Sequence, residues 1–148
     1  MKCSNYIGET MNIAEELGIK GILFVSHIGK FIKVAGGIMN THSREADCRA
    51  ELMAAFALRA GADRKTASAI LDTITTDEAL EIMEQAGIMK DAMQQAVQRI
   101  QYYLQNRVQG RLETEIILFS NTFGHLAQTD QADVMLEKIK NAEVIRDV

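Results

Sequence analysis

The order of apolar and polar positions along the chain predicts helices that alternate with two short strands. Over most of the chain the apolar residues recur every three or four positions, which is the spacing of one face of an α-helix. Two short runs are instead apolar at consecutive positions, as in strands buried on both faces, and these are Gly21–Ser26 and Glu115–Phe119. Helices are predicted over Ile7–Leu17, Ile28–Val34, Ala46–Ala60, from Asp63 onward, from Thr75 to Gly87, over Met89–Leu104 and up to Lys140, with a final strand over Glu143–Arg146.

Capping residues set the ends of several predicted helices. Ser4 or Asn5 can cap the first helix, and Gly18 stands where a C-terminal glycine belongs. Thr75 and Glu78 have the spacing of a capping box. The sequence contains no proline, so glycines and caps separate the elements and the helices run without proline kinks.

The longest amphipathic segment, Met89–Leu104, has a continuous apolar stripe. A stripe of this kind is more typical of a core helix or of a contact between the subunits of a homo-oligomer than of a cofactor site. Its glutamines are predicted to face outward, and they are Gln94, Gln95, Gln98, Gln101 and Gln105.

Strands that alternate with helices indicate an α/β fold: a helix-rich, Rossmann-like parallel sheet flanked by helices. Two confident strands are too few for such a sheet. The segment Lys2-Cys3-Ser4 has the character of the tail of a further strand. We therefore expect residues 1–148 to form a single α/β domain that is an incomplete part of a larger enzyme. A missing partner strand supplied by a dimer explains the same pattern equally well.

Composition narrows the function classes. The net charge of −4 argues against a nucleic-acid surface, and no apolar run approaches the length of a membrane span. Cys3 and Cys48 form no CxxC pair, and the cysteines and histidines lack metal-ligand spacing, so no metal site is predicted. Free thiols and an N-terminus without an apolar signal segment favour a cytoplasmic protein.

Candidate chemistry is concentrated in the polar stretch Ala35–Asp47, which lies between two apolar, helix-prone segments. A connector needs only a cap and a glycine, whereas a loop that wraps a polar ligand needs this density of donors and acceptors. A glycine pair at its start would let the backbone approach a ligand closely, although it serves equally well as a helix C-cap. The candidates in this loop are Gly36, Gly37, Asn40, Thr41, His42, Ser43, Arg44 and Asp47.

Small polar residues also follow each predicted strand end, where α/β proteins bind ligands. We expect the three ends to line one crevice together with the loop, although helix capping would explain one or two of them. Lys30 would suit an anionic ligand, and Glu9 could reach the crevice from the first helix, where an acid also suits the helix dipole. The strand-end candidates are Ser4, Asn5, Ser26, His27, Ser120, Asn121 and Thr122.

Several of these candidates have an equally simple structural interpretation. His27 and His42 could act as an acid or a base, or could be hydrogen-bonded structural histidines. Lys30 could be a solvated lysine. Arg44 and Asp47 are three residues apart, so a surface ion pair between them is the favoured reading.

Two phrases of the sequence resemble a known family when taken together. They are KCSNYIGE over Lys2–Glu9 and GKFIKVAGGIMNTHSREAD over Gly29–Asp47. They are similar to the C-terminal part of the cobalt-precorrin-5B C1-methyltransferase family, CbiD, of anaerobic cobalamin biosynthesis. The sequence departs mildly from the family pattern at Tyr6, for Phe, and at Ser26, for Gly.

The resemblance implies methyl transfer from S-adenosylmethionine to C1 of a cobalt-precorrin, with cobalt present only as part of that substrate. Donors of the loop would suit the substrate's peripheral carboxylates, and Asp47 or Glu9 would suit ribose hydroxyls or the sulfonium charge. The family's Thr/Gly-rich opening segment, of the type GYTTGTCA, does not occur in this sequence. The expected partners are therefore the substrate and an N-terminal portion or second subunit. The alternative is a non-catalytic module that binds a tetrapyrrole or a partner.

Overall fold

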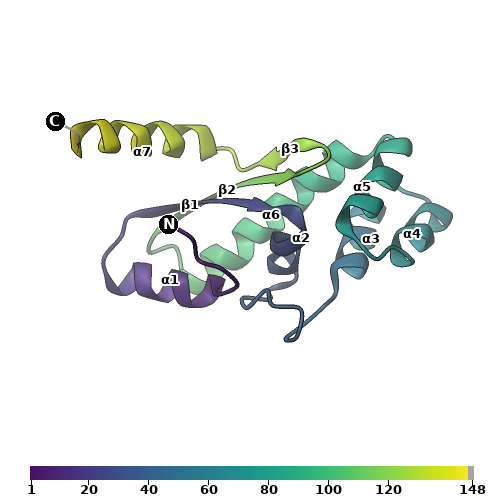
Figure 1. Ribbon diagram of the computed structural model, residues 1–148, viewed down its shortest axis with the longest axis horizontal. Coiled ribbons are helices and arrows are strands. Elements are labelled where there is room, and N and C mark those ends of the chain that lie inside the picture. The colour runs from purple at the N-terminus through teal and green to yellow at the C-terminus, as the bar shows by residue number, and fades with distance from the viewer. Residues whose placement is uncertain (147–148) are drawn as a thin grey trace.

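A long central helix, α6, lies against a small three-stranded sheet, with shorter helices at both ends (Figure 1). The computed structural model describes residues 1–146. In chain order the elements are α1 (Ile7–Glu16), β1 (Gly21–His27), α2 (Ile28–Phe31), the 3-10 helix η1 (Ile32–Gly36), α3 (Arg49–Arg59), α4 (Arg64–Leu71), α5 (Thr76–Gln85), α6 (Met89–Val108), β2 (Glu113–Ser120), β3 (Gly124–Gln128) and α7 (Ala132–Arg146).

The sheet has the order β1-β2-β3 and is mixed, which corrects the prediction of a Rossmann-like parallel sheet. β1 and β2 are parallel, as predicted, but β3 returns antiparallel to β2. The turn between them is tight because the Ser120 hydroxyl accepts a hydrogen bond from the Phe123 amide at 2.7 Å. Gly124 then adopts a positive φ of 69°, which glycine tolerates without strain.

β1 is an edge strand, and this corrects the prediction that it is buried on both faces. Phe24 is its one buried residue, and the Val25 side chain is 58% exposed. The predicted strand tail at Lys2-Cys3-Ser4 is not a strand in the structure. The N-terminus lies beside β1 without pairing to it (Figure 1).

The glutamines of α6 do not all face outward, as the sequence pattern predicted. Gln94 donates to the Gln128 carbonyl of β3 at 3.1 Å. Gln101 donates to the Thr114 carbonyl of β2 at 2.8 Å, and Gln105 donates to the fully buried Thr114 hydroxyl at 2.6 Å. These amides satisfy polar groups of the sheet beside the apolar stripe, so α6 is a core helix with a polar seam.

Most predicted helix ends are confirmed. Thr75 and Glu78 form the capping box, Asp63 caps α4, and Gly18 follows α1 with φ 68°. The N-cap of α1 is Tyr6, without a side-chain cap bond, so neither Ser4 nor Asn5 caps it.

The C-terminal prediction is wrong, because residues 143–146 continue α7 as helix rather than forming a strand. No proline or glycine interrupts the sequence there. Among the described residues, no helix is long and apolar enough to cross a membrane.

Candidate functional site

The N-terminal phrase and the polar loop are joined by a set of hydrogen bonds. Thr41 donates twice to Asn5, from its amide to the carbonyl and from its hydroxyl to Oδ1, both at 3.0 Å. Tyr6 and Asn40 form an isolated antiparallel bridge. The Met39 carbonyl accepts from the amides at the start of α1. The two segments therefore form one unit, which we call the junction and define as residues 4–8 with residues 39–41.

Gly8 allows the two halves of the junction to approach each other. A Cβ at this position would lie 2.9 Å from the Met39 Cβ and 2.8 Å from the Arg107 guanidinium carbon. The Arg107 side chain donates to the Gly8 carbonyl at 3.2 Å. A glycine is therefore required here by packing against both the loop and α6.

Two lysines donate hydrogen bonds to backbone carbonyls of the junction. Lys30 Nζ lies 3.0 Å from the Ser4 carbonyl oxygen, and Lys33 Nζ lies 3.0 Å from the Thr41 carbonyl oxygen. Lys33 is only 2% exposed, and no described carboxylate forms an ion pair with it. The Lys33 ammonium therefore has its described hydrogen-bond partner in the junction, and it brings a positive charge to the interior side of the loop.

Lys33 was not among the candidates that the sequence predicted. The signal for it was present, because a single lysine interrupts the apolar run Phe31–Ala35. In a solvated helix face a lysine would have polar neighbours, whereas here the flanking side chains are buried.

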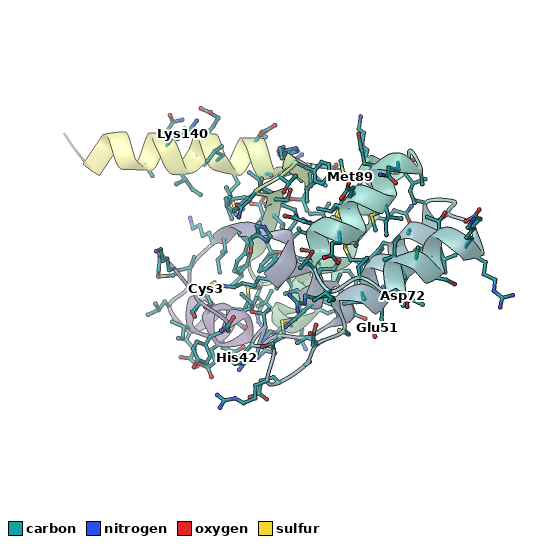
Figure 2. The ribbon with its side chains drawn as sticks, turned by 45° about the vertical axis from the view of Figure 1, so that its right-hand side comes forward. Cys3, His42, Glu51, Asp72, Met89 and Lys140 are labelled. Carbon is teal, nitrogen blue, oxygen red and sulfur yellow. The ribbon has the colours of Figure 1, made fainter. Side chains whose placement is uncertain are left out.

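The polar loop uses much of its own hydrogen-bonding capacity. Asn40 Oδ1 accepts from the His42 amide, and His42 Nδ1 accepts from the Arg44 amide at 3.0 Å. Asp47 pairs with Arg49 through two bonds, rather than with Arg44 as the sequence suggested. Figure 2 shows His42 on the side of the molecule that carries α1, away from Met89. These hydrogen bonds within the loop explain part of its high content of polar residues.

Two ionisable groups at the end of the loop are shifted by their surroundings. The hydrogen bond from the Arg49 side chain lowers the pKa of Asp47 below its ordinary value. Burial raises the pKa of the Cys48 thiol, and the nearby Glu51 carboxylate raises it further. Cys48 is thus held as a protonated thiol at neutral pH.

The glycine pair has a structural explanation. Gly37 is the C-cap of η1 with φ 82°, and a Cβ there would lie 3.0 Å from the Tyr103 ring. Gly36 is exposed, and the atoms nearest to a Cβ at this position belong to the Leu52 side chain. The C-cap interpretation is therefore confirmed for Gly37.

His27 also has a structural role in this arrangement. Its Nδ1 accepts from the Gly29 amide at 3.0 Å and so caps α2. Its ring packs edge-on against Phe119 of β2, with 5.8 Å between ring centroids. With Nδ1 as an acceptor, a neutral His27 carries its proton on Nε2.

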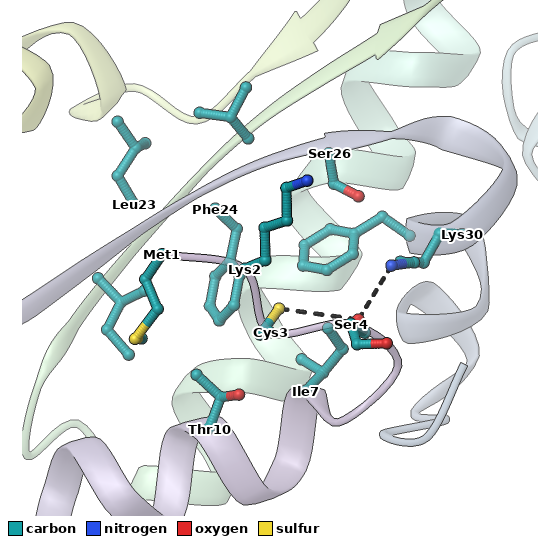
Figure 3. Close-up of a pocket in the computed structure, with 13 residues that line it drawn as sticks. Met1, Lys2, Cys3, Ser4, Ile7, Thr10, Leu23, Phe24, Ser26 and Lys30 are labelled. Atoms are coloured by element: carbon teal, nitrogen blue, oxygen red, sulfur yellow. Dashed lines mark hydrogen bonds between the residues drawn. The ribbon is translucent and has the colours of Figure 1, made fainter. Parts of the chain in front are cut away.

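A pocket of about 540 Å³ lies between the N-terminal segment and β1 (Figure 3). Lys30 reaches the Ser4 carbonyl at its polar end, and Ser26 lines the same end. Its charged lining residues are Lys2 and Lys30, and no carboxylate lines it. The pocket therefore favours an anionic group over a cationic one.

Among the described residues, the predicted crevice forms only in part: Ser4, Ser26 and Lys30 line the pocket beside β1, and the parallel register places His27 level with Phe119. Ser120 is buried in its turn, and Thr122 donates to Asp77 of α5 at 3.0 Å, outside the pocket beside β1. Glu9 is exposed on α1 and, like Asp47, does not line that pocket. The remaining candidates, Asn121 and Ser43, are also exposed.

The described residues contain no group of three or more His, Cys, Asp and Glu side chains placed to hold a metal ion.

Together these features define a helix-rich α/β domain with a small mixed sheet. Residues 40–130, more than half of the chain, match the family model described as "CbiD, C-terminal domain". The chain belongs to the CbiD family and corresponds to a C-terminal portion of it. This confirms the resemblance inferred from the two phrases.

The curated relatives that the chain matches are considerably longer than the chain. A cobalt-precorrin-5B C(1)-methyltransferase of Ruminiclostridium cellulolyticum is 40% identical over 121 residues, which are 82% of this chain and 32% of that protein. The protein of the same name from Thermoanaerobacter is 41% identical over 128 residues, covering 86% and 35%. That of Alkaliphilus metalliredigens is 35% identical over 144 residues, covering 97% and 38%.

The chain thus spans about a third of the length of the curated relatives that it matches. No solved structure matches it significantly.

Proposed function

We propose that this chain supplies the acceptor-binding part of a cobalt-precorrin-5B C1-methyltransferase, which transfers a methyl group from S-adenosylmethionine to C1 of the tetrapyrrole. Family membership supports the reaction class. The observation that carries the chain's own role is the pair of lysines that converge on the junction, Lys30 at the Ser4 carbonyl and Lys33 at the Thr41 carbonyl.

Carboxylate groups at the edge of a tetrapyrrole are the natural partners of these lysines. An ammonium that donates to a carboxylate forms a charge-assisted hydrogen bond, roughly twice as strong as a neutral one. Lys33 is buried and does not line the pocket beside β1, so in this proposal its weakly screened charge acts on a ligand that contacts the junction. The hydrogen bonds between Asn5 and Thr41 hold the junction before the ligand arrives, which reduces the entropy cost of binding.

The methyl donor fits the pocket beside β1 poorly. A sulfonium is positively charged, whereas the charged residues of this pocket are Lys2 and Lys30. The acidic candidates Glu9 and Asp47 do not line it. We therefore assign donor binding to another part of the enzyme, which in the longer relatives is the portion without a counterpart in this chain. Because the donor brings its own electrophilic methyl group, this chain's task is to orient the acceptor.

The test is reconstitution with the N-terminal portion of the Ruminiclostridium cellulolyticum relative, fused to this chain. Incubation with cobalt-precorrin-5B and S-adenosylmethionine, followed by mass spectrometry, should show an acceptor one methyl group heavier. Calorimetry should show heat of donor binding with the fusion but not with this chain by itself.

A non-catalytic tetrapyrrole-binding module is the second candidate, and the same cationic junction favours it. It predicts that the fusion binds the acceptor without methylating it. A cytoplasmic location and assembly into a homo-oligomer stay predictions from the sequence.

A further inference from the structure

A second groove, of about 500 Å³, continues from the pocket along the amino-terminal half of β1. It is lined mainly by apolar side chains, whereas the adjoining pocket is also lined by Ser4, Ser26 and Lys30, which do not line the groove. Three of its residues are large and exposed: Ile13 at 54%, Leu17 at 71% and Ile19 at 41%. Three large, exposed apolar side chains around one groove make it a candidate interaction surface.

The groove borders an open sheet edge. β1 pairs with β2 on one side, and among the described residues no strand pairs with its other side. Gly21 and Ile22 at the start of β1 line the groove, so unpaired backbone groups lie next to exposed apolar side chains. Both features are what an added strand needs: backbone partners for its amides and carbonyls, and apolar contacts for alternate side chains.

We propose that this groove and the β1 edge bind a segment of the family's N-terminal portion, which adds a strand to the sheet. The inference rests on the proposed function, which requires that portion for donor binding. About two thirds of each curated relative's length has no counterpart in this chain. Met1 lines both the groove and the adjoining pocket, so a chain that extends upstream from it starts within the surface to be covered.

A second copy of the chain is the competing occupant. A symmetric pair of copies at this edge would place their Met1 residues on the same surface and obstruct the route of an upstream segment. The N-terminal portion fits better because it delivers the donor site to the polar end of the same continuous groove, next to Lys30 and Ser26.

Hydrogen–deuterium exchange tests the proposal on the fusion described above. The β1 amides on its open edge, which do not bond to β2, should exchange at least about tenfold more slowly in the fusion than in the 148-residue chain, because hydrogen bonding protects them. Leu17→Glu should restore the fast exchange, since it would bury an unpaired carboxylate in the groove. Leu58→Glu on α3 is the matched control: Leu58 is 52% exposed, lies outside the groove and should leave the protection intact.

Equal β1 exchange in the fusion and in the separate chain would overturn the proposal. So would a dimer of the separate chain, seen by sedimentation, that Leu17→Glu dissociates, because it makes a second copy the occupant. Protection of β1 without methyl transfer would support the proposed binding surface and contradict the proposed function. Methyl transfer without protection of β1 would support the proposed function and contradict the binding surface.

Discussion

Asn5 and Thr41, which are 36 residues apart in the sequence, hold each other through one backbone and one side-chain hydrogen bond. This pair explains why the two family phrases belong together: they are the two sides of one junction. Lys30 and Lys33 then add positive charge to its two carbonyls. The polar loop thus forms one half of a preformed junction that two lysines contact, and we propose this junction as the acceptor site.

Removing the Thr41 hydroxyl should destabilise the fold. Thr41 is 5% exposed, and Thr41→Val keeps its shape while leaving Asn5 Oδ1 without its donor. We expect the free energy of unfolding in urea to fall by about 1–2 kcal/mol. Ser43→Ala, in the exposed part of the same loop, should change it by less than about 0.5 kcal/mol. Equal effects of the two substitutions would show that the Asn5–Thr41 bond contributes nothing.

Lys33→Met should change the stability of the fold only slightly. The substitution removes a buried charge, which is favourable, and a hydrogen bond to the Thr41 carbonyl, which is unfavourable. We expect these to offset each other to within about 1 kcal/mol in urea unfolding. A loss of about 3 kcal/mol or more would instead mean that the ammonium is a structural strut.

Gly8→Ala should disturb the junction by overpacking. The new methyl group would meet the Met39 Cβ at 2.9 Å, and this atom is tied to the loop backbone and cannot swing away. We expect a loss of about 1–3 kcal/mol in unfolding free energy. Gly36→Ala is the control, since the atoms nearest to its methyl group would be the movable end of the Leu52 side chain, at 3.2 Å. A Gly8 variant as stable as the Gly36 variant would disprove the tight contact.

The Cys48 thiol should react slowly at neutral pH. Burial raises the pKa of Cys48 in the folded protein, so at any given pH less thiolate is present than in the unfolded chain. In a Cys3→Ser variant, the rate of alkylation by iodoacetamide should reach half its maximum at a higher pH when the protein is folded than in urea. A folded midpoint at or below the unfolded one would contradict this.

Local signals made much of the helical fold predictable. The capping box of Thr75 and Glu78 lies within four residues, and Gly18 ends α1 through its own backbone freedom, so neither depends on distant contacts. The family phrases likewise identified the residues of the junction. The contact between Asn5 and Thr41 is a tertiary contact across 36 residues, and no local sequence pattern predicts it.

The incorrect predictions concern residues and elements whose structure depends on tertiary contacts. β3 was not predicted because it has only five residues, with polar residues near both ends and no apolar run. Its pairing with β2 makes it a strand. Gln101 and Gln105 face the sheet because Thr114 offers acceptors there. Lys33 is buried because the loop brings the Thr41 carbonyl over it. The predicted crevice is incomplete because Thr122 donates to Asp77, outside the pocket that Ser4, Ser26 and Lys30 line.

Steady-state kinetics of the fusion enzyme, with Lys33 intact or changed, tests the central claim most directly. If the charge of Lys33 attracts a carboxylate of the acceptor to the junction, Lys33→Met should raise the KM for cobalt-precorrin-5B at least about tenfold while leaving the KM for S-adenosylmethionine unchanged, and Lys33→Arg should recover part of the loss. Methyl transfer with an unchanged acceptor KM in Lys33→Met would contradict the assignment of this junction to the acceptor.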